Sequence, residues 1–364
     1  MMSSRHRGNA LSPAGLSSRW VGLLVLVGVF ASTPAPADAA YAAIELATLT
    51  EGSSRVVRGV NDGGEAVGGA HIGHGLRGFL LSGGALLRID GPPGSDYSVA
   101  LGINSQGEIV GSANTGTRVL AFRSVRTGAS APLAPLPGDT SSQAFAVNDQ
   151  GTAAGYSSGP GEVRAVVWSR SAVVQSLSRL PGSDSSRGLA INNRRDVAGV
   201  ADTPTGRRAV LWRGGAVQDL GALAGHAVSE ALAINDLGEI VGSSGDDARR
   251  QAVLWGQRGA IQDLGTLPGG HSSRALGINN RSEVVGTSET GAGSQAFLWT
   301  QRSGIQDLND LVTARSGFVL THAVAISPRG IILAIGRDDD AAHADHGHDH
   351  HEFPLRVFLL VPQP

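Results

Sequence analysis

The sequence predicts an all-β fold, a seven-bladed β-propeller with four antiparallel strands in each blade. Three observations predict it: a short motif ending in Asn recurs at a near-constant interval, short alternating apolar segments fill each interval, and the two ends of the chain complement each other. Successive anchors, the last residues of the motif, stand 43 to 48 residues apart. Such a period without long helical patterns is typical of propeller blades. The anchors are Asn61, Asn104, Asn148, Asn192, Asn235, Asn279 and, in degenerate form, Ser327.

The chain is predicted to consist of a signal peptide (1–40) and a single propeller domain (41–364). Basic residues precede an apolar run at 20–31, which is too short to cross a bilayer because a span needs about 20 residues. Ala37-Asp38-Ala39 then fits a small-x-small cleavage site. We expect the mature chain to be exported, to the periplasm or out of the cell, with no membrane span.

The sixth repeat illustrates the four predicted strands. Strand a covers 274–279, strand b covers 283–288, strand c covers 295–300, and strand d follows before the next repeat. Apolar and polar residues alternate in these segments, which favours half-buried strands. Asn, Asp and Gly cluster between strands a and b, where a tight hairpin needs residues that tolerate left-handed backbone.

Strand a is predicted to be the innermost strand of each blade, because one of its faces is nearly bare. The residue two positions before each anchor is Gly or Ala in every repeat. Side chains alternate between the faces of a strand, and a bare face is needed where another backbone comes close. These residues are Gly59, Gly102, Ala146, Ala190, Ala233, Gly277 and Ala325.

Two further positions recur with the repeat. A small residue stands seven positions after each anchor, in strand b, and we expect it to let adjacent sheets pack face to face. A Trp stands 20 positions after four of the anchors; we expect it to pack between blades, the alternative being a platform on which a sugar or base stacks. The residues are Gly68, Gly111, Gly155, Gly199, Gly242, Gly286 and Ala334, and Trp168, Trp212, Trp255 and Trp299.

The ends of the chain predict how the ring closes. The last repeat reads as strands a, b and c and then the chain ends, so it lacks a strand d. Residues 46–61 align without gaps to residues 264–279, which places a strand d at 42–50 with no blade before it. We expect this strand to pair with 355–361, which would complete the last blade and hide two sheet edges.

The repeat resembles that of the HAF repeat family of predicted extracellular proteins. The resemblance is carried by "AFLW", "IQDLGTLPGG", "ALGIN" and "EVVGTS" and covers roughly residues 42–362. It implies an extracellular repeat protein. It carries no catalytic residues to this chain, because the role of the family is not established.

Composition excludes several classes of function. The net charge of −2 gives no electrostatic footprint for nucleic acid, and the absence of Cys excludes disulfides, thiolate chemistry and Cys-bound metals. We find no catalytic motif and predict no catalytic residues. The protein is more consistent with a binding protein than with an enzyme.

The d–a and b–c loops are predicted to share one end of the ring and to form the ligand-binding face. Ser and His recur in the d–a loops, with turn capping as the alternative role for the Ser and plain exposure for the His. Arg residues occupy the b–c loops, either as an anion-binding rim or as scattered solubilising charge. The predicted ligand-binding residues are Ser142, Ser186, His226, His271 and Ser273, and the Arg residues are Arg164, Arg207, Arg208, Arg249 and Arg250.

A His- and Asp-rich segment at 338–352 interrupts the last blade as an enlarged b–c loop. Imidazole and carboxylate ligands together suit Zn²⁺, Ni²⁺ or Cu²⁺. The alternative is a solvated acidic loop without a specific role. The predicted metal ligands are His343, Asp345, His346, His348, His350 and His351.

The sequence therefore predicts a secreted, monomeric, non-enzymatic binding or scaffold propeller, whose ligand is an unidentified protein, glycan or metal. Two alternatives stay open. One is a structural protein of the envelope or cell surface with no specific small ligand, and the other is an uncharacterised hydrolase or lyase.

Overall fold

A computed structural model of the chain describes residues 40–49, 56–72, 75–126, 129–247, 249–257, 259–313, 317–339 and 355–363. These residues form an all-β protein, as predicted, with strands β1 to β29 and one short 3-10 helix, η1. None of the helical structure in these ranges is long and apolar enough to span a membrane. The predicted signal peptide, up to residue 39, and the predicted metal ligands lie outside the described residues.

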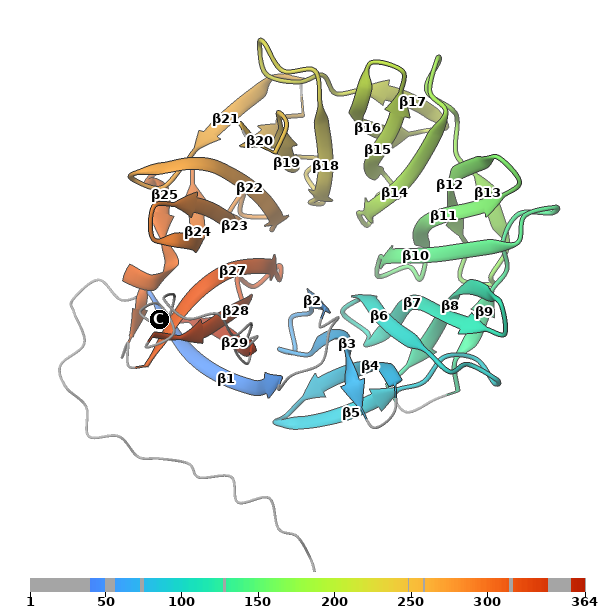
Figure 1. The fold of residues 1–364 in the computed structure, drawn as a ribbon, viewed down its shortest axis with the longest axis horizontal. Helices are drawn as coiled ribbons and strands as arrows, with labels where there is room; N and C mark the ends of the chain where they lie inside the picture. The colour runs from blue at the N-terminus through green and yellow to red at the C-terminus, as the bar shows by residue number, and fades with distance from the viewer. Residues whose placement is uncertain are drawn as a thin grey trace, which may run out of the picture. The chain divides into compact units, whose positions relative to one another are not determined.

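The strands fall into sets of four that follow the repeats of the sequence, and each set runs outward from a common axis (Figure 1). The first three sets are β2 (Val56–Val60), β3 (Ala66–Ile72), β4 (Gly75–Ser82) and β5 (Ala85–Ile89); β6 (Ser98–Ile103), β7 (Glu108–Thr115), β8 (Arg118–Val125) and β9 (Ala131–Leu133); and β10 (Ser141–Val147), β11 (Ala153–Gly159), β12 (Glu162–Trp168) and β13 (Val174–Ser176).

The next three sets continue in the same order. They are β14 (Ser185–Ile191), β15 (Val197–Thr203), β16 (Gly206–Arg213) and β17 (Ala216–Asp219); β18 (Ser229–Ile234), β19 (Ile240–Ser244), β20 (Gln251–Trp255) and β21 (Ile261–Gly265); and β22 (Gly270–Ile278), β23 (Val284–Thr290), β24 (Gly293–Thr300) and β25 (Gly304–Asp307). Helix η1 (Leu308–Asp310) and strand β26 (Val312–Thr313) follow, and then β27 (Phe318–Ile326), β28 (Ile332–Asp338) and β29 (Leu355–Pro362).

Within each set, consecutive strands pair antiparallel, so each sheet is a simple meander. One parallel bridge between Val163 and Ser185 joins β12 to β14, and the third and fourth sets therefore share an eight-stranded sheet. The predicted strands of the sixth repeat correspond to β22, β23 and β24, with ends that differ by a few residues.

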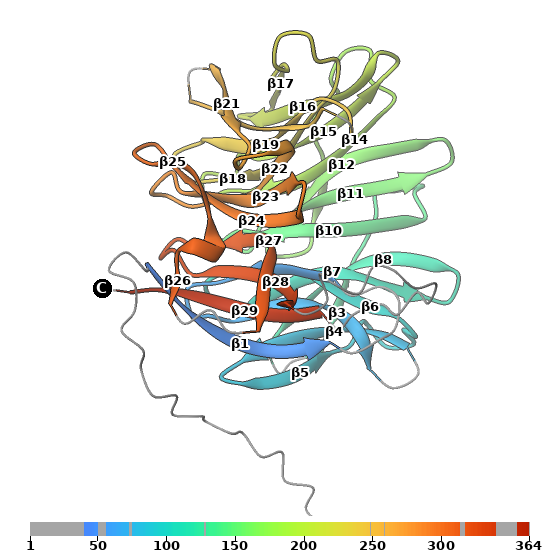
Figure 2. The ribbon, with the colours of Figure 1, turned by 60° about the vertical axis from the view of Figure 1, so that its left-hand side comes forward.

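The N-terminal strand β1 (Tyr41–Leu49) lies beside the last strand of the chain. It pairs antiparallel with β29 from Tyr41 opposite Pro362 to Leu49 opposite Leu355. Figure 1 and Figure 2 both show β1 along the outer side of β29. Arg356 on β29 adds an ion pair, with its Nη2 2.6 Å from Oε2 of Glu45. The predicted pairing of the two chain ends is therefore present, and the sheet of β27, β28 and β29 receives its fourth strand from β1.

The small residues of strand a are required by the close approach of neighbouring repeats. A Cβ added to Gly102 would lie 2.7 Å from the carbonyl oxygen of Phe145, in the next innermost strand. A Cβ added to Gly277 would lie 3.1 Å from the amide nitrogen of Ile326. The prediction that this face is bare because another backbone lies against it is confirmed.

The glycine in strand b has a different role from the one predicted. An added Cβ at Gly111, Gly155 or Gly199 would overlap a main-chain carbonyl oxygen of strand a in the same repeat. Strand a carries a β-bulge beside each of these glycines, for example between Ala100 and Gly102. A bulge displaces the backbone from the regular ladder. The glycine therefore makes room within its own sheet and not between adjacent sheets.

The anchor Asn connects each repeat to the next. Asn148 accepts hydrogen bonds on Oδ1 from the N–H groups of Gln150 and Thr152, at 3.1 and 2.9 Å, which fixes its own turn. Its Nδ2 donates to the carbonyl oxygen of Asn192, 2.9 Å away in the following repeat. The same cross-repeat bond, at 2.9 to 3.1 Å, joins Asn61 to Asn104, Asn104 to Asn148, Asn192 to Asn235 and Asn235 to Asn279.

Hydrophobic packing between sheets completes each contact. All four repeated Trp side chains are buried. Trp299, for example, packs with Val241 and Leu254 of the preceding repeat. Trp168 and Trp212 also donate from Nε1 to carbonyl oxygens of Ala134 and Ser178, each at 2.7 Å. Packing between blades is therefore confirmed as their role.

We predict that Asn192→Ala destabilises the protein by about 2–3 kcal/mol, because it leaves buried main-chain groups in two repeats without partners. The amide of Asn192 bonds to the carbonyl of Asn235 at 3.0 Å and to the N–H groups of Arg194 and Asp196 at 3.0 and 2.9 Å. Equilibrium denaturant unfolding measures the change. Gln106→Ala, at an exposed position of an equivalent turn, is the control. A cost for Asn192→Ala no larger than for the control would contradict the role of the anchor.

Candidate functional site

The predicted ligand-binding serines are buried and hydrogen-bonded to the main chain. Ser142 Oγ donates to the carbonyl oxygen of Leu133 at 3.0 Å and accepts from the N–H of Ala121 at 3.0 Å. Ser186 and Ser273 accept in the same way from strand c of the preceding repeat. These hydroxyls hydrogen-bond strand a of one repeat to the main chain of the preceding repeat. Ligand binding by them stays a prediction, and their burial argues against it.

His226 lies in the loop between β17 and β18, whereas His271 lies at the start of strand β22 and not in a loop, and no contact between described residues joins the two. His226 is half-buried, with Nδ1 3.1 Å from Oγ of Ser244, and lines a recess of about 250 Å³. His271 is exposed. Within the described ranges, no group of three or more His, Asp or Glu side chains is placed to hold a metal ion. Metal binding by 338–352 stays a prediction.

A second, larger recess opens at the predicted ligand face, between the fourth and fifth repeats. Its volume is about 420 Å³. It lies where the b–c hairpins of the two repeats meet the start of strand β18, and it adjoins the recess of His226, with which it shares Val228, Gly245 and Asp246. We call it the charged recess; its lining is Asp202, Thr203, Gly206, Arg207, Val228, Glu230, Gly245, Asp246, Asp247 and Arg250.

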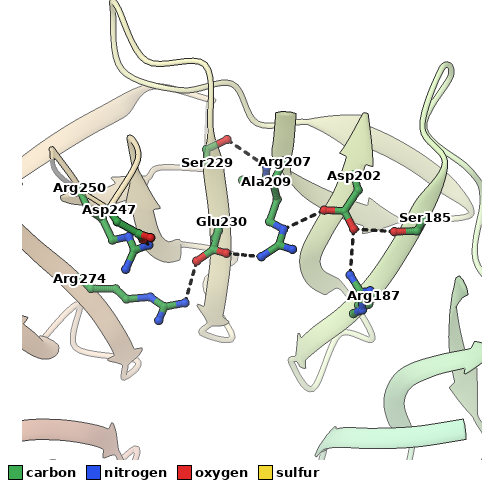
Figure 3. Close-up of polar contacts among 10 residues, drawn as sticks. All are labelled: Ser185, Arg187, Asp202, Arg207, Ala209, Ser229, Glu230, Asp247, Arg250 and Arg274. Carbon is green, nitrogen blue, oxygen red and sulfur yellow. Dashed lines mark hydrogen bonds and ion pairs between the residues drawn. The ribbon is translucent and has the colours of Figure 1, made fainter. Parts of the chain in front are cut away.

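Charges of alternating sign cross the charged recess from one repeat to the next (Figure 3). The carboxylate of Asp202 on β15 forms ion pairs with Nη1 of Arg187 at 3.0 Å and with Nε of Arg207 at 2.8 Å. Arg207 also reaches Glu230 Oε1 at 2.7 Å, and Glu230 Oε2 lies 2.7 Å from Nη2 of Arg274. We call these five residues, from strands β14, β15, β16, β18 and β22, the charged row. It spans three repeats.

Hydrogen bonds hold the carboxylates of the charged row ionised. Burial opposes the charge of Asp202, but the Ser185 hydroxyl and the Arg207 and Arg187 guanidinium groups outweigh it and lower its pKa from 3.8 to about 2. Burial likewise opposes the charge of Glu230, and Arg207 and Arg274 lower its pKa. The Glu230 side chain is only 13% exposed. The row is therefore a fixed, fully charged surface at neutral pH.

The charged row presents paired hydrogen-bond donors and acceptors. Its guanidinium groups present planar pairs of N–H donors, and its carboxylates are acceptors only. Every carboxylate in it is paired with Arg, so none stands as a free base. The chemistry of such a surface complements groups that carry both donors and acceptors.

Sequence reasoning found Arg207 and Arg250 in the b–c loops but missed Asp202 and Glu230. For Glu230 a signal was present, at the position five residues before each anchor. That position is Val in the first two repeats and Gln143, Arg187, Glu230, Arg274 and His322 in the others. The fold does not require a charged residue at this position, because the first two repeats carry Val there. The charged residues at this position in later repeats therefore indicated a functional surface.

A separate pocket of about 270 Å³ lies on the axis at the opposite, a–b turn end. Residues of every repeat line it, with Val or Ile before each anchor and mostly Asp or Asn after it. The polar groups there are largely bonded to one another; Asn193 Nδ2, for example, donates to Asp149 and Asp236 at 3.0 and 3.2 Å. We assign this pocket to the linkage between repeats.

No protein-family model matches the sequence, and no curated protein matches it. Solved structures share the fold. Virginiamycin B lyase from Staphylococcus aureus is 11% identical, with a TM-score of 0.51 over 88% of this chain and 99% of that one. YCF48 bound to D1 peptide is 12% identical, with a TM-score of 0.53 over 92% and 98%.

A third structure of similar fold is the β-propeller domain of the Trilobed protease from Pyrococcus furiosus. It is 10% identical, with a TM-score of 0.52 over 85% of this chain and 94% of that one. At such low identity these likenesses show the fold alone. The chain therefore has a β-propeller fold.

We predict that Asp202→Asn is less stable than the wild type at pH 7 and that this difference shrinks as the pH falls from about 4 to about 2. A carboxylate with a lowered native pKa stabilises the fold above its unfolded pKa, and this contribution is lost as the pH falls through the native value of about 2. Thermal melts across this pH range test it, with Asp184→Asn, at an exposed loop position, as the control. A difference that is constant with pH would contradict the assignment.

Proposed function

We propose that the chain is an exported, seven-bladed β-propeller of the HAF repeat type, closed by its N-terminal strand, which acts as a binding protein. Support for closure comes from the β1–β29 pairing and from a hydrogen bond of 2.9 Å between the N–H of Arg329, in the last repeat, and Oδ1 of Asp62, in the first. Support for seven blades comes from the strand sets, each of which corresponds to one repeat of the sequence.

The proposed ligand is a peptide segment of a partner protein that carries charges of both signs. The observation that carries this proposal is the charged row across the charged recess. A peptide supplies cationic and anionic side chains and main-chain donors and acceptors, so it can pair with Arg207 and Glu230 alternately along its length. A neutral glycan has no formal charges and would leave such a row without matching partners.

Affinity at this site would arise from exchange of partners. Arg207 and Glu230 already form an ion pair at 2.7 Å in the free protein. The binding free energy is therefore the difference between the ion pairs formed with the ligand and the pair that they replace. Fixed geometry limits the entropy that binding must overcome. We therefore expect modest affinity with strong selectivity for charge order.

Two other proposals from the sequence stand beside this one. Divalent-metal capture by 338–352 concerns residues outside the described ranges. A lyase or hydrolase activity is supported only by similarity of fold, which the chain shares with virginiamycin B lyase at 11% identity. Neither is favoured by the geometry of the charged recess.

We predict that the wild-type protein selects peptides containing both basic and acidic residues from an array of ten-residue peptides. Glu230→Gln should weaken the best peptide at least tenfold, because loss of a charge-assisted pair removes about 1.5–3 kcal/mol. Biolayer interferometry on that peptide measures the change. Raising the salt from about 0.05 to 0.5 M should also weaken it.

Glu162→Gln is the matched control, since Glu162 also pairs with Arg residues but lies on β12, outside the charged recess. Its affinity should equal that of the wild type. The proposal is wrong if no peptide on the array binds, or if Glu230→Gln binds the selected peptide as tightly as the control.

A further inference from the structure

The fifth repeat differs from the others at two positions that border a single recess. This is the recess of about 250 Å³ described above, and its lining includes His226, Gly245, Asp246 and Arg249. We call it the His226 recess. It shares Gly245 and Asp246 with the charged recess. The His226 recess therefore extends the charged recess on one side.

The first difference is Gly245, ten positions after the anchor. The other repeats carry a side chain at this position. The backbone at Gly245 has a φ of +104°, and an added Cβ would lie 2.5 Å from the carbonyl oxygen of Arg249 and 3.1 Å from Cε1 of His226. A glycine here therefore leaves room for the His226 ring and opens the recess. The equivalent residues are His71, Asn114, Ser158, Asp202, Glu289 and Arg337.

The second difference is His226 itself, nine positions before the anchor. In the second, third, fourth and sixth repeats this position holds Ser95, Asp139, Ser183 and Gly270. The two serines donate to main-chain carbonyl oxygens of their own turns, each at 2.7 Å, and both carboxylate oxygens of Asp139 are engaged. His226 has a second ring nitrogen, Nε2, which bonds to none of the described residues. Its side chain therefore retains a polar atom that the loop does not use.

The contact with Ser244 makes this second nitrogen a donor. The buried Ser244 Oγ accepts the N–H of Leu223 at 2.9 Å, and its own hydrogen points to Nδ1 of His226, 3.1 Å away. The equivalent Ser157 likewise accepts a main-chain N–H and donates to Asp139 at 2.6 Å. With Nδ1 as acceptor, the neutral imidazole carries its hydrogen on Nε2, and a protonated ring carries one there as well. Since Nδ1 is turned toward a buried residue and the ring is half-buried, Nε2 faces the recess.

Arg249 supplies a second donor to the same recess. Its main-chain N–H donates to Oδ1 of Asp246 at 3.1 Å, which fixes the hairpin. Its guanidinium is exposed and makes no ion pair or hydrogen bond within the described ranges, whereas Arg207 and Arg250 of the charged recess are paired with carboxylates. The uncommitted groups of His226 and Arg249 are therefore both donors, and a complementary ligand group must be an acceptor.

We propose that the His226 recess binds a carboxylate group, with Nε2–H of His226 donating to one oxygen and the guanidinium of Arg249 balancing the charge. Bonds from such donors to a carboxylate are charge-assisted and stronger than neutral ones. The carboxylate of Asp246 on the shared wall opposes a second negative charge, so an acid with one charge fits better than a phosphate.

This inference deepens the proposed function, on which it rests, because it specifies one group of the peptide ligand. Either an acidic side chain or the C-terminal carboxylate of the peptide would enter the His226 recess, while neighbouring residues of the peptide contact the charged row. The two sources share the same chemistry and differ in what is attached to the carboxylate. Small model acids therefore distinguish them without the rest of the peptide.

Titration of the mature protein at low ionic strength, followed by the NMR signal of the Gly245 amide, tests the recess. The probes are N-acetylglutamate α-amide for a side-chain acid, N-acetylglycine for a terminal acid, and N-acetylglutamine amide as the uncharged match. We expect at least one acid to saturate with a Kd in the millimolar range, at least fivefold tighter than the uncharged amide. The tighter acid identifies the source of the carboxylate.

Two substitutions of His226 separate binding from stability. His226→Asn keeps an acceptor for Ser244 but lacks Nε2, so it should weaken the better acid at least fivefold and leave the Tm within about 2 °C. His226→Gln places an amide near Nε2 but loses the Ser244 bond, so it should bind the acid more tightly than His226→Asn and melt lower. Arg249→Gln should also weaken the acid, whereas Arg302→Gln, at an exposed position between β24 and β25, should not.

The proposal is wrong if neither acid shifts the Gly245 signal, if the uncharged amide binds as tightly as the acids, or if His226→Asn binds as tightly as Arg302→Gln. These results are separate from those of the peptide array. Saturation by an acid with no peptide bound on the array would reject the peptide ligand and retain the carboxylate site. Peptide binding that is unchanged in His226→Asn, with no response to either acid, would reject the carboxylate site alone.

Discussion

The structure depends on how closely the innermost strands approach one another around the axis. Main-chain atoms of adjacent repeats come so near at Gly102 and Gly277 that a side chain would collide with the neighbouring backbone. The carbonyl oxygens of the anchors are bonded within buried contacts, where a polar main-chain group needs a partner. The anchor Asn supplies it, donating across the repeat boundary while its Oδ1 holds its own turn. One residue thus couples local hairpin geometry to the arrangement of the blades.

This inner linkage leaves other positions free to vary. The residue five before the anchor differs between repeats: it is Val in the first two, and Gln, Arg, Glu, Arg and His in the others. Asp202, Arg207 and Glu230 are held in place by strands whose packing they do not determine. A rigid frame with variable side chains at one end is what a recognition surface requires.

Periodicity allowed much of the fold to be predicted. Equal spacing located the strands, the small residues located the axis, and the alignment of 46–61 with 264–279 placed β1 beside β29. Contacts between repeats were harder. Ser142 resembled a loop residue, yet its hydroxyl bonds to main-chain groups of two strands, β8 and β9, in the preceding repeat. The pairing of Arg207 with Glu230, 23 residues apart, depends on the angle between two sheets, which no local pattern encodes.

Closure of the ring by the N-terminal strand can be tested directly by comparing the protein that begins at residue 40 with one that begins at residue 50. Removal of β1 would expose the edge of β29 and break the Glu45–Arg356 ion pair of 2.6 Å. Unpaired edges promote association. We predict that the shorter protein melts at least about 10 °C lower and associates in multi-angle light scattering. A monomer with an unchanged Tm would contradict a ring closed in this way.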